Sequence, residues 1–190
     1  MNKLILVSIG LIMSFSYGCR TAQRSSSAPE SSDKNVTTGY STNFMEQTTW
    51  LLGYFSRDRM AIPPHSEWYS KGYDSYQPDQ AFITRLQNIS RDEITIRIVL
   101  GTWCPDSRRE VPRFMRIIDL WGFPAEKITF IGVDNEKIAP VGEYEKLNIM
   151  RVPTFIFYKN NVEAGRIIEV PLTSLEQDMV NILDKEANKN

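Results

Sequence analysis

Apolar residues in the second half of the chain recur with periods that predict strands and helices in alternation. Residues 94–100 are β-branched and mostly apolar, which predicts a central strand buried on both faces. Apolar residues at helical spacing follow and predict a helix, in which Pro112 is expected to cause a kink. Residues 127–134 predict a second buried strand. Together these segments predict a unit of strand, helix and strand in which the two strands are parallel.

The chain is predicted to end with an antiparallel hairpin and a helix. After a short helix at 144–149, apolar runs at 155–158 and 162–170 are separated by the turn signal Asn160-Asn161. Thr173 and Glu176 have the spacing of a capping box, and the residues after them predict a helix with one apolar face.

Residues 44–91 are predicted to form a helical extension in front of this α/β region. Apolar residues fall near helical spacing in 44–60 and again in 78–90. The intervening residues 62–77 contain several aromatic residues, interpreted as a loop whose rings pack onto the core. The alternative is that these rings form a lid or a wall that contacts a bound peptide.

The first 43 residues differ from the rest in composition. Lys3, the short apolar stretch 4–15 and Cys19 have the order of a bacterial lipoprotein signal, although Ser16 stands where leucine is usual. We expect residues 1–18 to be a signal peptide and Cys19 to be lipidated. An ordinary secretory signal or an uncleaved anchor is the alternative. Residues 19–43 are rich in Ser and Thr, which predicts a flexible tether.

These features predict one domain over residues 44–188, anchored to a membrane of the cell envelope and facing the periplasm. The formal net charge of −1 gives no indication of a nucleic-acid partner. If Cys19 carries lipid, Cys104 is the remaining thiol of the chain. One free cysteine and His65, the one histidine, do not make a metal site, so no metal or cofactor is expected.

Candidate chemistry centres on Trp103-Cys104-Pro105-Asp106-Ser107, where the first buried strand turns into the helix. Unpaired N–H groups and the helix dipole at this position favour the thiolate form of Cys104. Arg108 is expected to add to this effect and Asp106 to oppose it. His65 is interpreted as a surface residue, with pairing to the thiolate as the less favoured alternative. A dithiol site would need a second sulfur at Ser107, so a mixed disulfide on Cys104 has no internal thiol to release it.

The order of these features resembles the thioredoxin superfamily, particularly its membrane-anchored or secreted bacterial members. The resemblance covers residues 92–186 and rests on Trp-Cys-Pro at a helix start, Pro112, Val152-Pro153-Thr154, Gly165 and the closing helix. It implies a thioredoxin-like α/β fold with a central mixed sheet flanked by helices. It also implies that Pro153 is a cis-proline facing Cys104, and that Val152 offers backbone hydrogen bonds to an extended substrate.

Two residues depart from the family pattern. Ser107 replaces the second cysteine, and Ile98 occupies the position of the family's buried acid, six residues before the nucleophile. Both differences point away from an ordinary disulfide reductase, and the signature of peroxiredoxins is absent. The hypothesis is therefore a monothiol thiol-disulfide oxidoreductase that forms mixed disulfides with cysteine-containing envelope proteins or small thiols.

The candidate site residues divide by role. The catalytic candidates are Cys104, Ser107 and Pro153, and the substrate-contacting candidates are Trp103, Pro105, Val152 and Thr154. A thioredoxin-like binding module without redox activity is the alternative function. Burial of the Cys104 sulfur would count against the redox hypothesis.

Overall fold

The computed structural model describes residues 43–44 and 46–184, so the predicted signal peptide, Cys19 and nearly all of the predicted tether lie outside the described residues. The chain divides into two units between Gly39 and Tyr40, and everything described here belongs to the second. Within the described residues, none of the helices has both the length and the apolar character needed to cross a membrane.

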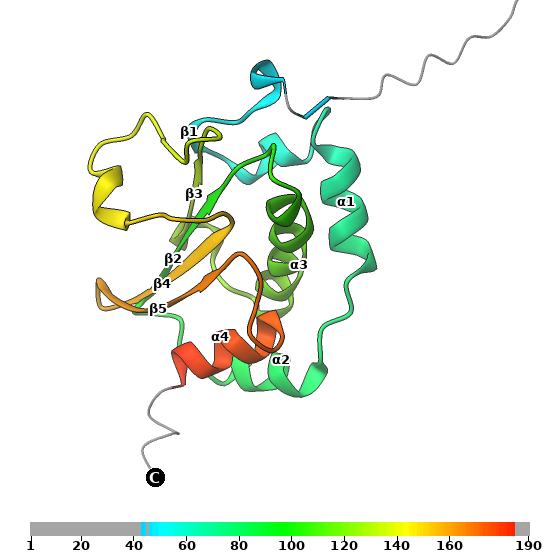
Figure 1. Cartoon of the computed structure of the whole chain (residues 1–190). Coiled ribbons are helices and arrows are strands. Elements are labelled where there is room, and N and C mark those ends of the chain that lie inside the picture. The colour runs from blue at the N-terminus through cyan, green and yellow to red at the C-terminus, as the bar shows by residue number, and fades with distance from the viewer. Residues whose placement is uncertain (1–42, 45, 185–190) are drawn as a thin grey trace, which may run out of the picture. The chain divides into compact units, whose positions relative to one another are not determined.

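Five strands and four α-helices form an α/β fold (Figure 1). The strands are β1 (Gly53–Phe55), β2 (Ile94–Leu100), β3 (Ile128–Gly132), β4 (Thr154–Lys159) and β5 (Val162–Ile168). The α-helices are α1 (Ser66–Ser75), α2 (Gln80–Gln87), α3 (Pro105–Trp121) and α4 (Leu175–Leu183).

The strands form one mixed sheet in the order β1-β3-β2-β4-β5. β2 and β3 are parallel, whereas the pairs β1 with β3, β2 with β4 and β4 with β5 are antiparallel. The predicted unit of parallel strands joined by a helix and the predicted hairpin are both confirmed. Asn160 and Asn161 have φ of 53° and 63°, the left-handed conformations that a two-residue hairpin turn requires.

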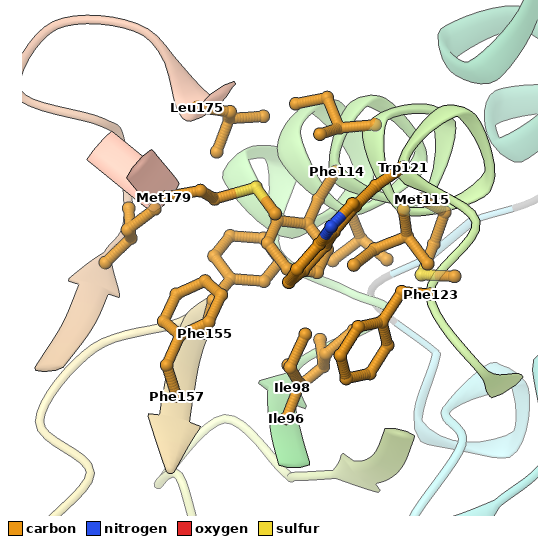
Figure 2. Close-up of a cluster of buried hydrophobic side chains, with 14 of the residues drawn as sticks. Ile96, Ile98, Phe114, Met115, Trp121, Phe123, Phe155, Phe157, Leu175 and Met179 are labelled. Carbon is orange, nitrogen blue, oxygen red and sulfur yellow. The ribbon is translucent and has the colours of Figure 1, made fainter. Parts of the chain in front are cut away.

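The main core lies between α3 and one face of the sheet. Figure 2 shows Phe114 and Trp121 of α3 pointing toward Phe155 and Phe157 of β4, beside Ile96 and Ile98 of β2. The ring centroids of Phe114 and Phe155 are 4.2 Å apart and the rings are stacked. Ile98, at the position where the resemblance led us to look for a buried acid, is a fully buried residue of the apolar core.

The extension packs directly on α3, as Figure 1 shows for α1. Gly72 of α1 makes this close approach possible, because a Cβ at Gly72 would lie 2.5 Å from Cγ of Pro112. α3 contains Pro112 within its length, and it ends at Gly122, which adopts φ of 70°.

The prediction of one helix over residues 44–60 is wrong. This segment contains two 3-10 turns, Gln47–Thr49 and Arg57–Met60, with strand β1 between them. Gly53 has φ of 73°, which an α-helix does not accommodate. β1 instead pairs with β3 and covers its edge, so backbone pairing outweighed the helical spacing of the side chains.

The interpretation of residues 62–77 as a loop is also wrong, because they contain α1. The interpretation that their rings pack onto the core is confirmed: Tyr69 is buried, and Trp68, Tyr73 and Tyr76 pack against the core. His65, interpreted as a surface residue, is only 3% exposed.

The predicted capping box of Thr173 and Glu176 is wrong, because the helix begins one residue later than it requires. Ser174 is the N-cap of α4 and accepts a hydrogen bond from the backbone N–H of Gln177. The hydroxyl of Thr173 donates to Asp178 instead. Glu176 is buried and accepts hydrogen bonds from the hydroxyl of Tyr76 (2.8 Å) and the N–H of Asp79 (3.0 Å). Glu176 thereby joins the last helix to the extension.

Candidate functional site

Cys104 lies at the N-terminus of α3, against the loop that precedes β4. It is the N-cap residue of the helix, and its carbonyl accepts a hydrogen bond from the N–H of Arg108 (3.1 Å). Its Sγ donates to the carbonyl oxygen of Val152 at 3.3 Å. The peptide bond between Val152 and Pro153 is cis. The structure thus brings the cysteine and the cis-proline loop together, as the family resemblance implied.

Cys104 is a buried residue, 7% exposed. It packs in a second apolar cluster with Val99, Val133 and Val152, against which Trp103 is partly buried. The indole N–H of Trp103 donates to the carbonyl of Val133 (3.0 Å). This burial counts against the redox hypothesis, and it limits access to the sulfur.

Ser107 and Thr154 use their hydroxyl groups within the fold. Ser107 is fully buried, and its Oγ accepts a hydrogen bond from the backbone N–H of Gly101 (3.3 Å). Thr154 is also buried and donates to the carbonyl of Arg151 (2.7 Å). Pro105, by contrast, is exposed at the first position of the helix. Among the predicted site residues, Trp103, Cys104, Val152 and Pro153 form the compact group.

Within the described residues, Asp106 is paired with another residue, whereas Arg108, the other charge expected to act on the thiol, is not. Asp106 is engaged by Arg109 at 2.7 Å, and Arg109 also pairs with the buried Glu110 at 2.6 Å. Arg108 forms no ion pair among the described residues and lies over the ring of Phe44, 4.4 Å from its centroid. Burial lowers the pKa of Arg108, while the nearby Cys104 raises it. Arg108 is therefore an uncompensated cation close to the thiol.

Residues of the extension contact the motif, and the sequence did not predict these contacts. The ring of Trp50 lies against Trp103, with centroids 6.1 Å apart. The N–H of Leu51 donates to the hydroxyl of Thr102, directly before the motif (3.2 Å). The many aromatic residues of the extension were the one sign in the sequence of a contact between it and the motif. Neither the period of apolar residues nor the spacing of motifs indicates a contact between residues about fifty positions apart.

His65 belongs to this aromatic group, and its ring contacts are with Phe44 and Trp68, not with Cys104. Burial is the main reason that its pKa is lowered, the positive charge of Arg59 lowers it further, and a backbone hydrogen bond with Thr49 opposes the shift. Nδ1 of His65 is buried without a hydrogen-bond partner. The histidine is therefore neutral and structural near pH 7.

Comparison with known proteins found no matching family model and no matching curated protein. Solved structures do match. A protein of unknown function, PA1234 from Pseudomonas aeruginosa, is 18% identical over 64% of this chain and 71% of its own, with a TM-score of 0.40. Oxidised thioredoxin O2 from Arabidopsis thaliana is 21% identical over 55% of this chain and 88% of its own (TM-score 0.37). Mitochondrial thioredoxin 3 from Saccharomyces cerevisiae is 15% identical over 60% and 98% (TM-score 0.35).

Proposed function

We propose that this protein carries out thiol-disulfide exchange through the single thiol of Cys104. The observation that supports this most is the place of Sγ, at the N-terminus of α3 and 3.3 Å from the carbonyl of Val152 in the cis-proline loop. A helix N-terminus and a nearby cation are common surroundings of reactive cysteines, and Cys104 stands at the N-cap of α3 four residues before Arg108.

The exchange takes two steps. The thiolate of Cys104 attacks one sulfur of a partner disulfide, a new S–S bond forms, and the other partner sulfur leaves as a thiolate with the electron pair. Because Ser107 cannot attack the mixed disulfide, a second thiolate from solution must do so, and Cys104 leaves as a thiolate. One disulfide and one thiolate enter the cycle, and one of each leaves it.

Two substitutions test this proposal on the full chain. Cys104→Ser is expected to abolish both alkylation of the thiol and formation of a mixed disulfide, which mass spectrometry measures. Ser107→Cys introduces a second thiol one helical turn away and is expected to shorten the lifetime of the mixed disulfide. Ser107→Ala is the control for loss of the hydrogen bond from Gly101. A wild-type protein that forms no mixed disulfide with small disulfides would contradict the proposal.

The burial of Cys104 favours a second candidate, a thioredoxin-like binding module without turnover. In that case, the surface beside the cis-proline loop holds a partner, and the cysteine packs the apolar cluster. Partner capture would then survive Cys104→Ser unchanged, whereas a redox partner trapped as a mixed disulfide would be lost.

We further propose that Cys19 is lipidated and that the protein is anchored in the cell envelope, facing the periplasm. The sequence order of Lys3, the apolar stretch 4–15 and Cys19 supports this. Metabolic labelling with a radioactive fatty acid is expected to label wild type and Cys104→Ser but not Cys19→Ser. Equal labelling of all three, or of none, would exclude lipidation at Cys19. The expected partners are cysteine-containing envelope proteins or small thiols.

A further inference from the structure

A small pocket lies where the extension meets the first turn of α3. It has a volume of about 250 Å³ and is lined by Phe44, Glu67, Trp68, Lys71 and Arg108. Four of these residues come from the extension, and Arg108 alone comes from the helix that starts at the reactive cysteine. The pocket is therefore specific to the way this extension packs on α3, and its size fits one short arm of a small molecule.

The charges of the lining residues favour an anion. Arg108 and Lys71 form no ion pair within the described part of the chain, and Glu67 is the one acidic residue in the lining. Two cations thus face one carboxylate in the lining, and the carboxylate of a ligand would pair with the excess positive charge.

The pocket shares a helix face with the thiol. Arg108 follows Cys104 by four residues at the start of α3, so the two side chains lie on the same face of the helix. A carboxylate bound at Arg108 would place a sulfur a few atoms away on the face that also carries Cys104. The limited exposure of Cys104 favours a slender disulfide over one held on a folded protein surface.

We propose that this pocket selects the exchange partner, and that the partner is a low-molecular-weight disulfide with a carboxylate a few atoms from its sulfur. This inference rests on the proposed exchange function. The carboxylate binds Arg108 and Lys71, and the thiolate of Cys104 attacks the nearer sulfur. The S–S bond of the ligand breaks, and its other half leaves as a thiolate with the electron pair. A second thiolate of the same class then releases the bound half as a disulfide.

Three small disulfides of similar size and different charge test the inference on the full chain. They are dithiodipropionate, which is anionic, bis(hydroxyethyl) disulfide, which is neutral, and cystamine, which is cationic. The rate of mixed-disulfide formation on Cys104 is measured for each. Wild type is expected to prefer the anionic disulfide over the neutral one by roughly fivefold, the size of one favourable ion pair at a partly exposed site. Added salt should reduce this preference.

For each pocket variant, the rate with the anionic disulfide is divided by the rate with the neutral disulfide. A change in the fraction of Cys104 that is present as thiolate affects both rates alike and leaves this ratio unchanged. Arg108→Gln and Lys71→Gln are expected to lower this ratio, and Glu67→Gln is expected to raise it. Arg109→Gln is the matched control, since Arg109 lies outside the pocket and pairs with Asp106 and Glu110. Its ratio should equal that of wild type.

The outcomes separate the two proposals. Equal rates with all three disulfides, or a ratio that the pocket variants leave unchanged, would overturn the selective pocket while leaving exchange at Cys104 intact. A ratio that falls as much in Arg109→Gln as in Lys71→Gln would assign the effect to net charge and would also overturn it. Failure of wild type to react with any of the three would overturn the exchange function itself.

Discussion

At the scale of single residues, Gly132 shows how closely the extension approaches the sheet. It lies in β3 opposite Gly53 of β1, and a Cβ at Gly132 would fall on the carbonyl oxygen of Leu51. That oxygen belongs to backbone that is held in place by the pairing of β1 and by the hydrogen bond from Leu51 to Thr102. The clash cannot be relieved by rotating a side chain.

Gly132→Ala is therefore expected to lower the free energy of unfolding by about 3 kcal/mol, because backbone must move to admit the methyl group. Gly142→Ala is the matched control, since a Cβ there meets no atom within 4 Å. It should change stability by less than about 0.5 kcal/mol. Urea unfolding followed by circular dichroism measures both, and equal stability of the two variants would contradict the close contact.

The position of Cys104 beside the cis-proline loop is also a residue-scale feature. Cys104 and Pro153 could be identified because the motif at the start of a helix and the Val-Pro-Thr segment are local patterns. The sequence could not show that Arg108 lacks an ion-pair partner among the described residues, because Arg108 and Arg109 are neighbours with the same charge. Only the fold shows that Arg109 takes both Asp106 and Glu110 as partners.

At the scale of elements, the connection between the segment around Phe44 and α1 depends on a buried histidine. His65 precedes α1, and its ring contacts the rings of Phe44 and Trp68. Because burial and Arg59 lower its pKa, the unfolded chain binds a proton in a pH range where the folded chain does not. His65 makes its full contribution to the free energy of unfolding above the usual histidine pKa of about 6.5, and this contribution is lost as the pH falls below that value.

We therefore expect a lower urea midpoint at about pH 5.5 than at about pH 7.5 for wild type. Carboxylates contribute little to this window, because their usual pKa values lie near or below about 4.3. His65 is the one histidine of the chain, so His65→Phe, which keeps a ring beside Phe44 and Trp68, should remove most of the difference. An unchanged pH dependence in His65→Phe would show that another group is responsible.

At the scale of the whole molecule, the extension is part of the fold and not an addition to it. Met60 and Leu86, both from residues 44–91, are fully buried in the main core with the α/β residues. β1 covers the edge of β3, and Glu176 of α4 accepts hydrogen bonds from Tyr76 and Asp79. Removal of the extension would expose this apolar surface and leave an unpaired sheet edge.

A fragment of residues 92–184 is accordingly expected to lack a cooperative unfolding transition, whereas a fragment of residues 43–184 should keep it. Calorimetry or urea unfolding distinguishes the two fragments. Cooperative unfolding of the shorter fragment with the midpoint of the longer one would show that the region resembling the thioredoxin superfamily is stable alone.

Most of the α/β core could be predicted from the sequence. The buried strands, the helix after the motif and the hairpin were predictable because period and turn residues act locally along the chain. The position of Cys104 at a helix N-terminus followed from the same local patterns.

Tertiary structure decided the rest. β1 formed inside a segment with helical spacing because it pairs with the edge of β3, a partner far away in the sequence. Burial of Cys104, isolation of Arg108 and the pocket beside them depend on residues from the extension meeting α3 in space. Such contacts join residues far apart in sequence, and no local pattern records them.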